Sequence, residues 1–207
     1  SGSFESQAIE LVTDVGPLDP GSELVARFTT DIVNSVNATT ASTGSASVQA
    51  QGLSSNDGQP VLWTDDNALE FVRRTTNLAQ PEAIPSSFYP IAAATFIRDE
   101  SATANSDAKP RQLTVLTDRS HGVASLSSGE LEIMLHRRCD SNDNKGNGEN
   151  LDETDHISAS TFLLFDEVGN SALNLRRLSI EQNFAPVCSD STTVINRNRA
   201  SLTPLSA

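Results

Sequence analysis

The chain has 207 residues, enough for one large domain with its own hydrophobic core. Its formal net charge is −13 and its pI is near 4.5, and such a polyanion is repelled by nucleic acid backbones and by anionic membrane surfaces. No apolar run approaches the roughly 20 residues that cross a bilayer. We therefore expect neither a nucleic acid partner nor a membrane partner.

The first residues indicate where the chain stands in its parent protein. No basic segment is followed by an apolar stretch, which is the pattern of a secretory signal. Ser1-Gly2-Ser3 resembles either a cloning remnant or the new end of a processed chain, so we expect this chain to begin inside a longer protein.

Apolar and polar residues alternate with a period of two along much of the chain, which predicts strands with one buried face. The first strand, residues 7–14, places Ile9 and Leu11 on one face. The later predicted strands follow in chain order: residues 23–31, 68–74, 91–99, 111–118, 122–126, 129–137, 160–166 and 173–184. No segment shows the period of a three-turn amphipathic helix. The pattern predicts an all-β fold, an antiparallel β-sandwich with long polar loops.

Polar stretches separate these strands and close the chain. Each is too poor in apolar residues to offset the entropy lost on ordering. We expect flexible loops at residues 34–60 and 101–110, an acidic loop at 140–155 and a flexible tail at 189–207. All belong to one domain that spans residues 1–207.

The acidic loop has part of a calcium-binding pattern. Asp140, Asn142 and Asn144 have the spacing of the first three calcium ligands, but Lys145 and Leu151 occupy the positions that require Gly and Glu. A solvated acidic loop is therefore the prediction, with an irregular cation site as the alternative.

The chain shows no convincing catalytic or zinc-binding cluster. Its histidines, His121, His136 and His156, lack the paired spacing of zinc ligands. Asp118, Ser120 and His121 are the residue types of a hydrolase triad, but neighbours on an extended segment point to opposite faces. With 27 acidic residues in the chain, no carboxylate pair stands out as a glycosidase pair.

Two further features depend on the compartment. Cys139 and Cys188 would form a disulfide in a secreted or lysosomal protein, or stay as two small buried thiols. Asn37 begins the N-glycosylation sequence Asn-Ala-Thr, so it should carry a glycan if the protein is secreted. A chance occurrence in a Ser/Thr-rich loop is the alternative.

Three segments resemble long motifs of glycoside hydrolase family 38, the α-mannosidases. Residues 111–122 read RQLTVLTDRSHG and are similar to the family's QLTVLTDRSQG. The other two segments are SFYP with ATFIRD at residues 87–90 and 94–99, and SL, GELEIM and HRR at residues 125–126, 129–134 and 136–138. TDRS and HRR are typical of the lysosomal branch. Weaker matches extend the resemblance to roughly residues 9–187.

The resemblance implies part of the C-terminal β-rich region, with a sandwich of the supersandwich type, of a retaining α-mannosidase that binds zinc. In the family, the zinc ligands and catalytic carboxylates lie in an N-terminal region with an H-x-D motif, which is absent from this sequence. The resemblance therefore implies no catalytic residue, metal ligand or cofactor in this chain. It implies the catalytic region of the same α-mannosidase and mannose-containing glycans as partners, and a lysosomal or secreted location.

One site can be carried over from the family. The loop after HRR reads D-D-x-R-G in the family and leans over the active site, and residues 142–146 (NDNKG) match it here. The resemblance implies that Lys145 and Gly146 contact substrate, with Lys145 offering a point charge in place of a planar guanidinium. We expect a non-catalytic β-domain that braces the catalytic domain and lends this loop to the sugar site. The alternative is a free-standing carbohydrate-binding or structural β-sandwich.

Overall fold

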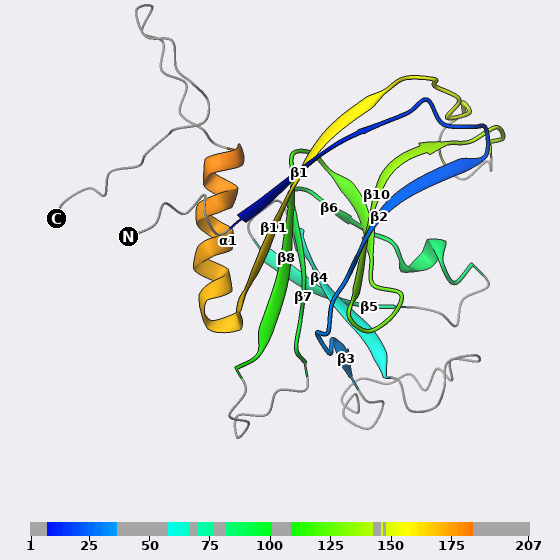
Figure 1. Ribbon diagram of the computed structural model, residues 1–207. Coiled ribbons are helices and arrows are strands. Elements are labelled where there is room, and N and C mark those ends of the chain that lie inside the picture. The colour runs from blue at the N-terminus through cyan, green and yellow to red at the C-terminus, as the bar shows by residue number, and fades with distance from the viewer. Residues whose placement is uncertain are drawn as a thin grey trace, which may run out of the picture.

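The computed structural model describes residues 8–36, 58–66, 70–76, 82–100, 109–142, 146 and 148–183 (Figure 1). The strands are β1 (Ala8–Val15), β2 (Ser22–Thr29), β3 (Ser35–Val36), β4 (Gln59–Asp66), β5 (Glu70–Thr75), β6 (Tyr89–Ile91), β7 (Ala94–Arg98), β8 (Arg111–Thr117), β9 (His121–Ala124), β10 (Glu130–Arg138) and β11 (Ile157–Glu167). The helices are the short 3₁₀ helix η3 (Pro85–Ser87) and α1 (Val168–Asn183).

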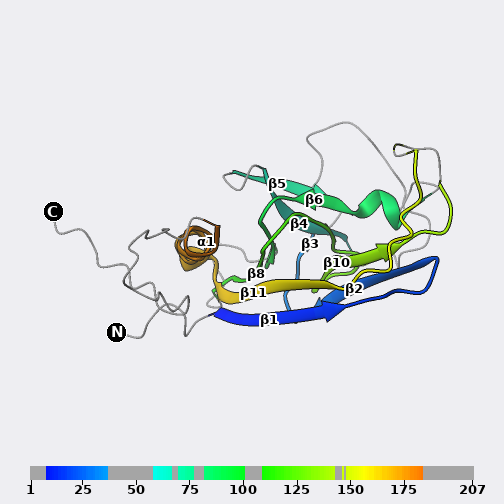
Figure 2. The same ribbon diagram turned by 90° about the horizontal axis from the view of Figure 1, so that it is seen from above.

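The strands form two sheets that face each other. In the described part of the chain, the larger sheet has the order β1-β11-β8-β7-β4-β3, with β5 also paired to β4, and the smaller sheet has the order β2-β10-β9-β6. Every pairing is antiparallel. This architecture confirms the predicted all-β antiparallel sandwich. Figure 2 shows β1 and β2 along one side of the molecule and β5 and β6 along the other.

The hydrophobic core lies between the inner faces of the sheets. Alternation along β10 predicted its buried residues, and Leu131 and Ile133 have no exposed surface. Burying one such side chain stabilises the fold by about 1.5–3 kcal/mol. The buried members of this core are Ile32, Leu62, Ile91, Ile97, Leu113, Val115, Val123, Leu131 and Ile133.

Helix α1 corrects the prediction of a strand at residues 173–184. Leu173 and Leu175, like Leu178 and Ile180, lie two residues apart and therefore mimic a strand. In the structure Leu175 and Leu178 are buried, whereas Leu173 is 65% exposed and Ile180 is also exposed. The buried residues are three apart, one helical turn, and pack on the outer face of the larger sheet. This second cluster consists of Ala94, Leu116, Phe162, Leu164, Leu175 and Leu178.

Strand β4 was not predicted, and it begins inside the expected loop at residues 34–60. Its apolar run, residues 61–63, is too short to show a period, yet Val61 and Leu62 are buried. Asn34, at the other end of that expected loop, is also buried. Residues 37–57, 101–108 and 189–207 of the expected loops and tail lie outside the described residues.

The turn before β10 requires glycine. Gly129 has a φ of 81°, and an added Cβ would lie 2.5 Å from the Thr30 carbonyl oxygen and 3.1 Å from that of Ile32. Gly129→Ala is therefore expected to lower the free energy of unfolding by about 2 kcal/mol. Gly169→Ala in α1 meets nothing within 4 Å and should leave stability unchanged or slightly higher. Urea denaturation of both variants measures the contrast, and equal losses would contradict this description of the turn.

Candidate functional site

The predicted sugar loop follows β10, and its base is closed by hydrogen bonds. The backbone N–H of Cys139 donates to the Leu151 carbonyl at 2.7 Å, and Asn150 Nδ2 donates to the Asp140 carbonyl at 3.1 Å. Gly146 is exposed, and a Cβ added there would meet nothing within 4 Å. The surface at Gly146 is thus open to a partner.

Most other predicted site residues cannot be placed. Lys145, Asn144, Asn37 and Cys188 lie outside the described residues, and Cys139 is half-buried at the loop base. Substrate contact, glycosylation and disulfide pairing therefore stay predictions. Among the described residues, no three His, Cys, Asp or Glu side chains come together as a metal site. None of the helices described here is long and apolar enough to span a membrane.

Arg138, the last residue of β10, connects the base of the loop to the rest of the sandwich. Arg138 Nη1 donates to the Leu18 carbonyl at 2.7 Å, which ties β10 to the connection between β1 and β2. His136 is 8% exposed, and its Nε2 has no hydrogen-bond partner among the described residues. The end of β10 is therefore held against the β1–β2 connection rather than left free.

The turn from β8 to β9 holds the residue types of a triad but uses them structurally. The Asp118 carboxylate accepts hydrogen bonds from Arg119, at 2.9 Å from Nη2, and from the backbone N–H of Ser160 at 3.2 Å. His121 Nδ1–H donates to the Met134 carbonyl at 2.7 Å. Neither side chain is directed at a nucleophile, so this turn is a structural element of the sandwich.

The pKa of Asp118 reflects these contacts. Burial acts to raise the pKa, but the hydrogen bonds from Arg119 and Ser160 and the charges of Arg119 and His121 outweigh it, so the pKa lies below its ordinary 3.8. Because the folded-state pKa is depressed, the carboxylate contributes stability above pH 3.8, and that contribution is lost as the pH falls through the folded-state value.

Asp118→Asn is therefore expected to be less stable than wild type at about pH 6 and to approach it at about pH 2. Urea denaturation across this pH range measures the gap between the two proteins. Asp152→Asn removes an exposed carboxylate and serves as the control. A gap for Asp118→Asn that stays constant with pH would argue against this electrostatic role.

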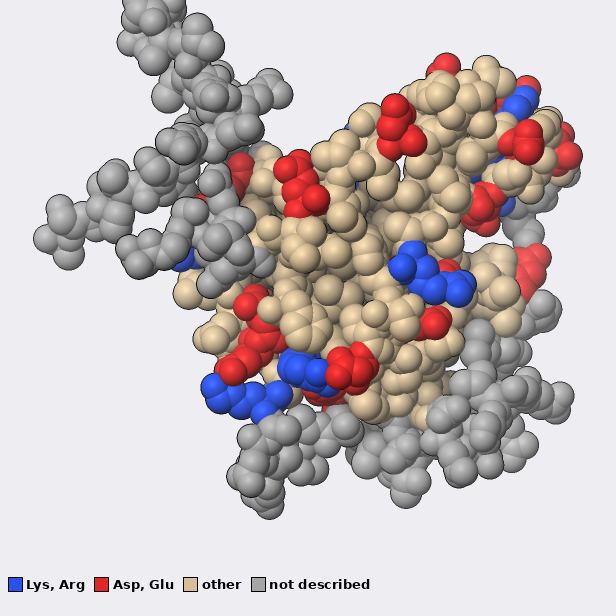
Figure 3. Space-filling view, viewed as in Figure 1, with Lys and Arg blue, Asp and Glu red and all other residues tan. Residues whose placement is uncertain are grey.

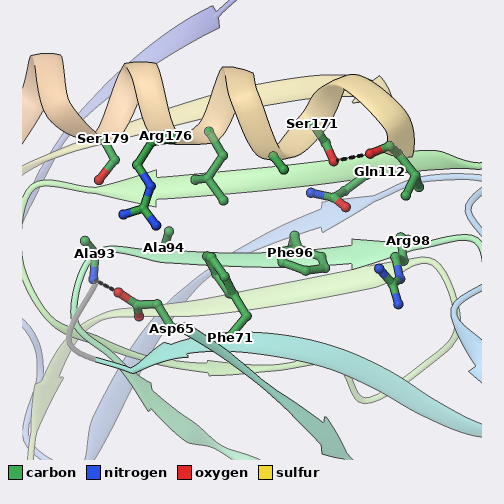
Figure 4. Close-up of a pocket in the computed structure, with 13 residues that line it drawn as sticks. Asp65, Phe71, Ala93, Ala94, Phe96, Arg98, Gln112, Ser171, Arg176 and Ser179 are labelled. Atoms are coloured by element: carbon green, nitrogen blue, oxygen red, sulfur yellow. Dashed lines mark hydrogen bonds between the residues drawn. The ribbon is translucent and has the colours of Figure 1, made fainter. Parts of the chain in front are cut away.

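A cavity of about 250 Å³ lies between α1 and the outer face of the larger sheet (Figure 4). Figure 4 shows Arg176 and Ser179 extending from α1 toward the sheet. This cavity could not be predicted from the sequence, because the pattern of its helical wall predicted a strand. The lining residues are Asp65, Phe71, Ala93, Ala94, Phe96, Arg98, Gln112, Val168, Ser171, Ala172, Leu175, Arg176 and Ser179.

The polar groups that line this cavity already have partners. Asp65 accepts from the backbone N–H groups of Ala92 and Ala93 at 2.8 and 2.9 Å. Gln112 Nε2 donates to Thr114 Oγ1 at 2.8 Å. These groups hold the sheet and the β6–β7 turn in place, so the cavity offers apolar walls without an acid–base pair.

An aromatic cluster adjoins the cavity. The Trp63 and Phe96 rings stack with centroids 5.7 Å apart, and the Arg98 guanidinium lies 4.5 Å from the centre of the Trp63 ring. Glu100 accepts from Trp63 Nε1 at 3.1 Å and pairs with Arg98. The arginine thus covers the tryptophan ring, and the cluster stabilises the outer face of the sheet.

Comparison with known proteins shows the family. The model of the glycosyl hydrolases family 38 C-terminal domain matches residues 4–145. The chain belongs to this family. The match includes β1 to β10 and ends inside the acidic loop, so β11 and α1 lie beyond it. The resemblance found in the motifs is confirmed.

Curated relatives of this family 38 chain are α-mannosidases. Lysosomal alpha-mannosidase of Mus musculus is 31% identical over 185 residues, which are 86% of the chain and 16% of the relative. The enzyme of the same name from Cavia porcellus is 30% identical over 191 residues, again 86% of the chain and 16% of the relative. A probable alpha-mannosidase of Arabidopsis thaliana is 36% identical over 99 residues, 45% of the chain and 9% of the relative. The chain thus spans about a sixth of the lysosomal relatives.

Proposed function

We propose that this chain is a non-catalytic C-terminal β-domain of a lysosomal-type α-mannosidase that acts on α-mannosides of N-glycans. It braces the catalytic domain and contributes the loop after β10 to the sugar site. The observation that carries the proposal is the family 38 match over residues 4–145. The similarity to lysosomal α-mannosidases, about 30% identity over 86% of the chain, supports the proposed substrate class and the proposed lysosomal or secreted location.

The proposal divides the chemistry between two regions of the parent protein. The catalytic region holds the zinc and the catalytic carboxylates, as the family resemblance implies. This chain supplies a rigid sandwich and a loop that reaches mannose-containing glycans. In a lysosomal or secreted protein, a glycan on Asn37 and a disulfide between Cys139 and Cys188 would fit the same environment.

Lys145 and Gly146 bind and orient sugar in this proposal. A lysine donates hydrogen bonds to sugar hydroxyls as a point charge, and nothing near it in the sequence makes it a proton-transfer group. Gly146 lets the backbone approach a ligand closely because it has no Cβ, and its surroundings are open. The hydrogen bond from Cys139 to Leu151 limits how far the loop can move.

Kinetics of the full-length enzyme test the loop. Lys145→Ala and Gly146→Val should lower kcat/KM for mannosides by about tenfold or more, since a hydrogen bond to a charged group contributes about 1.5–3 kcal/mol. The glycine change should have the larger effect if backbone contact dominates. Gly148→Val, two residues further along and also without a neighbour within 4 Å, is the matched control. Wild-type kcat/KM in both loop variants would leave the loop as a solvated acidic turn.

A further inference from the structure

The cavity under α1 lies where the outer face of the larger sheet is left uncovered. In the described part of the chain, β7 stands between β8 and β4 in that sheet, and β4 also pairs with β5. The cluster that contains Leu175 joins α1 to β8 and β11, and Phe71 of β5 packs against the same cluster. Between α1 and Phe71, the alternating residues Ala94, Phe96 and Arg98 of β7 line the cavity (Figure 4). The floor of the cavity is thus the part of β7 that neither α1 nor β5 covers.

Small and polar residues of α1 keep this space open. The α1 residues that line the cavity follow the spacing of one helix face: Val168, Ser171, Ala172, Leu175, Arg176 and Ser179. Only the valine and the leucine are large and apolar, so the helix does not fill the space below it. Ala172 and Arg176 are exposed, whereas Ser171 and Ser179 are buried. The cavity therefore opens to solvent beside Ala172 and Arg176, and a ligand can enter it without unfolding of the helix.

The volume and the walls of the cavity suit a single aromatic ring. The cavity has a volume of about 250 Å³, and an apolar cavity of about 150 Å³ already holds a benzene molecule. The Phe71 and Phe96 rings line it, with centroids 5.0 Å apart and planes tilted by 53°. Aromatic rings favour such tilted contacts. Because Phe96 also stacks on Trp63, a ligand ring would extend an existing row of aromatic side chains.

The charged groups that line the cavity favour an anion. They are Arg98, Arg176 and Asp65. Both carboxylate oxygens of Asp65 accept hydrogen bonds from backbone N–H groups, at 2.8 and 2.9 Å, which offset part of its charge. Arg98 pairs with Glu100, whereas Arg176 extends from α1 toward the sheet at the mouth of the cavity (Figure 4). Arg176 is therefore the cation best placed for the negative group of a ligand.

The rest of the protein carries the opposite balance of charge. The chain has 27 Asp and Glu residues against 14 Lys and Arg residues. Figure 3 shows acidic groups spread over the face that it views, with fewer basic ones. Such a surface repels small anions, so an anion binds where cations are concentrated. A site with two arginines and one hydrogen-bonded aspartate, lined by apolar walls, provides this environment.

We propose that the cavity between α1 and the outer face of the larger sheet binds a small aromatic monocarboxylate. The ring of the ligand lies against Phe71 and Phe96, and its carboxylate accepts hydrogen bonds from Arg176 at the mouth. The cavity holds no acid–base pair, so the ligand is bound and not converted. Because the ligand contacts both α1 and β5, its binding stabilises the folded chain by mass action. This inference does not rest on the proposed function.

A saturation-transfer NMR titration of the full-length parent protein with phenylacetate tests the site. We expect saturable binding with a dissociation constant of about 1 mM or tighter. Ala172→Leu fills the mouth of the cavity and Arg176→Met removes the cation, so each should weaken binding at least about tenfold. Arg177→Met is the matched control, because Arg177 is the next residue of α1, is exposed and does not line the cavity. Phenylacetamide, which has the same ring without the charge, should bind more weakly than phenylacetate and should not distinguish wild type from Arg176→Met.

Three results would overturn the proposal: no saturable binding of phenylacetate, equal binding by wild type and all variants, or equal affinity for phenylacetate and phenylacetamide. The second result would place the ligand elsewhere in the parent protein, and the third would leave an apolar cavity that does not recognise an anion. If a variant fails to fold, photolabelling of the wild-type parent with an aryl azide derivative of phenylacetate gives the answer. The label should appear in the peptides that carry α1 and β5, and label confined to other peptides would reject the site.

Discussion

Replacing Asn34 by alanine is expected to lower the free energy of unfolding of this chain by about 3–5 kcal/mol. The side chain has no exposed surface. Its Nδ2 donates to the Val61 carbonyl at 2.6 Å and to Ser125 Oγ at 2.9 Å. Its Oδ1 accepts from the backbone N–H of Gly129 at 2.7 Å. Alanine would remove all three bonds; Ser125 Oγ keeps its bond to the Ser127 carbonyl, whereas the Gly129 N–H loses its acceptor, and each buried group left unpaired costs about 1–3 kcal/mol.

The position of Asn34 makes the loss larger than that of one local contact. Val61 belongs to β4 of the larger sheet, whereas Ser125 and Gly129 lie in the turn between β9 and β10 of the smaller sheet. The asparagine thus joins the two sheets. Its own carbonyl also accepts from the N–H of Val61 at 2.8 Å, a bond that the substitution leaves in place.

Asn150→Ala is the control for this prediction. Asn150 is exposed, and its side chain donates one hydrogen bond, to the Asp140 carbonyl. Its removal should change stability by less than about 1 kcal/mol. Chemical denaturation of both variants gives the comparison, and a loss for Asn34→Ala no larger than that for Asn150→Ala would contradict the role of Asn34 as a link between the sheets.

The apolar face of a strand could be predicted from the sequence. Along β10, Leu131 and Ile133 lie in the core, as their spacing predicts. The alternation also placed Glu132 and His136 on an exposed face, which is wrong, because both of these side chains are buried and Glu132 pairs with Arg27. The same reasoning placed Ile9 and Leu11 on one face of β1, which the register confirms. Their exposure could not be predicted, because alternation shows which face is apolar and not which surface covers it.

Helix α1 and strand β4 could not be predicted, for two different reasons. In α1, Leu175 and Leu178 form the buried face of the helix. Leu173 and Ile180 are exposed, but each lies two residues from a buried leucine, so the sequence alternates like a strand. In β4, burial on both faces gives a short apolar run that has no period. Both elements line the cavity under α1, β4 with Asp65 and α1 with Ser179. Spacing in the sequence does not show that these two residues line the same cavity.

The predicted sugar loop came from a family motif and not from periodicity. HRR marks the end of β10, and the structure places Gly146 in an exposed loop after that strand, as the motif implies. Contact between this loop and sugar depends on the catalytic region, which is a separate part of the parent protein in our proposal.

In our proposal, this chain supports α-mannoside hydrolysis and does not perform it. The family resemblance implies that the zinc ligands and catalytic carboxylates belong to a region with an H-x-D motif, and residues 1–207 do not contain that motif. The isolated chain should therefore show no turnover of an α-mannoside, whereas the full-length parent should be active. This is the largest of the expected effects.

The direct measurement is hydrolysis of an aryl α-mannoside in the presence of zinc, with the isolated chain and the full-length parent at equal molar concentration. Replacing the His and Asp of an upstream H-x-D segment in the parent is the control for catalysis by the N-terminal region. We predict release of the aryl group by the intact parent, and none above a buffer blank by the isolated chain or the control. Hydrolysis by the isolated chain that persists through repurification would contradict the account.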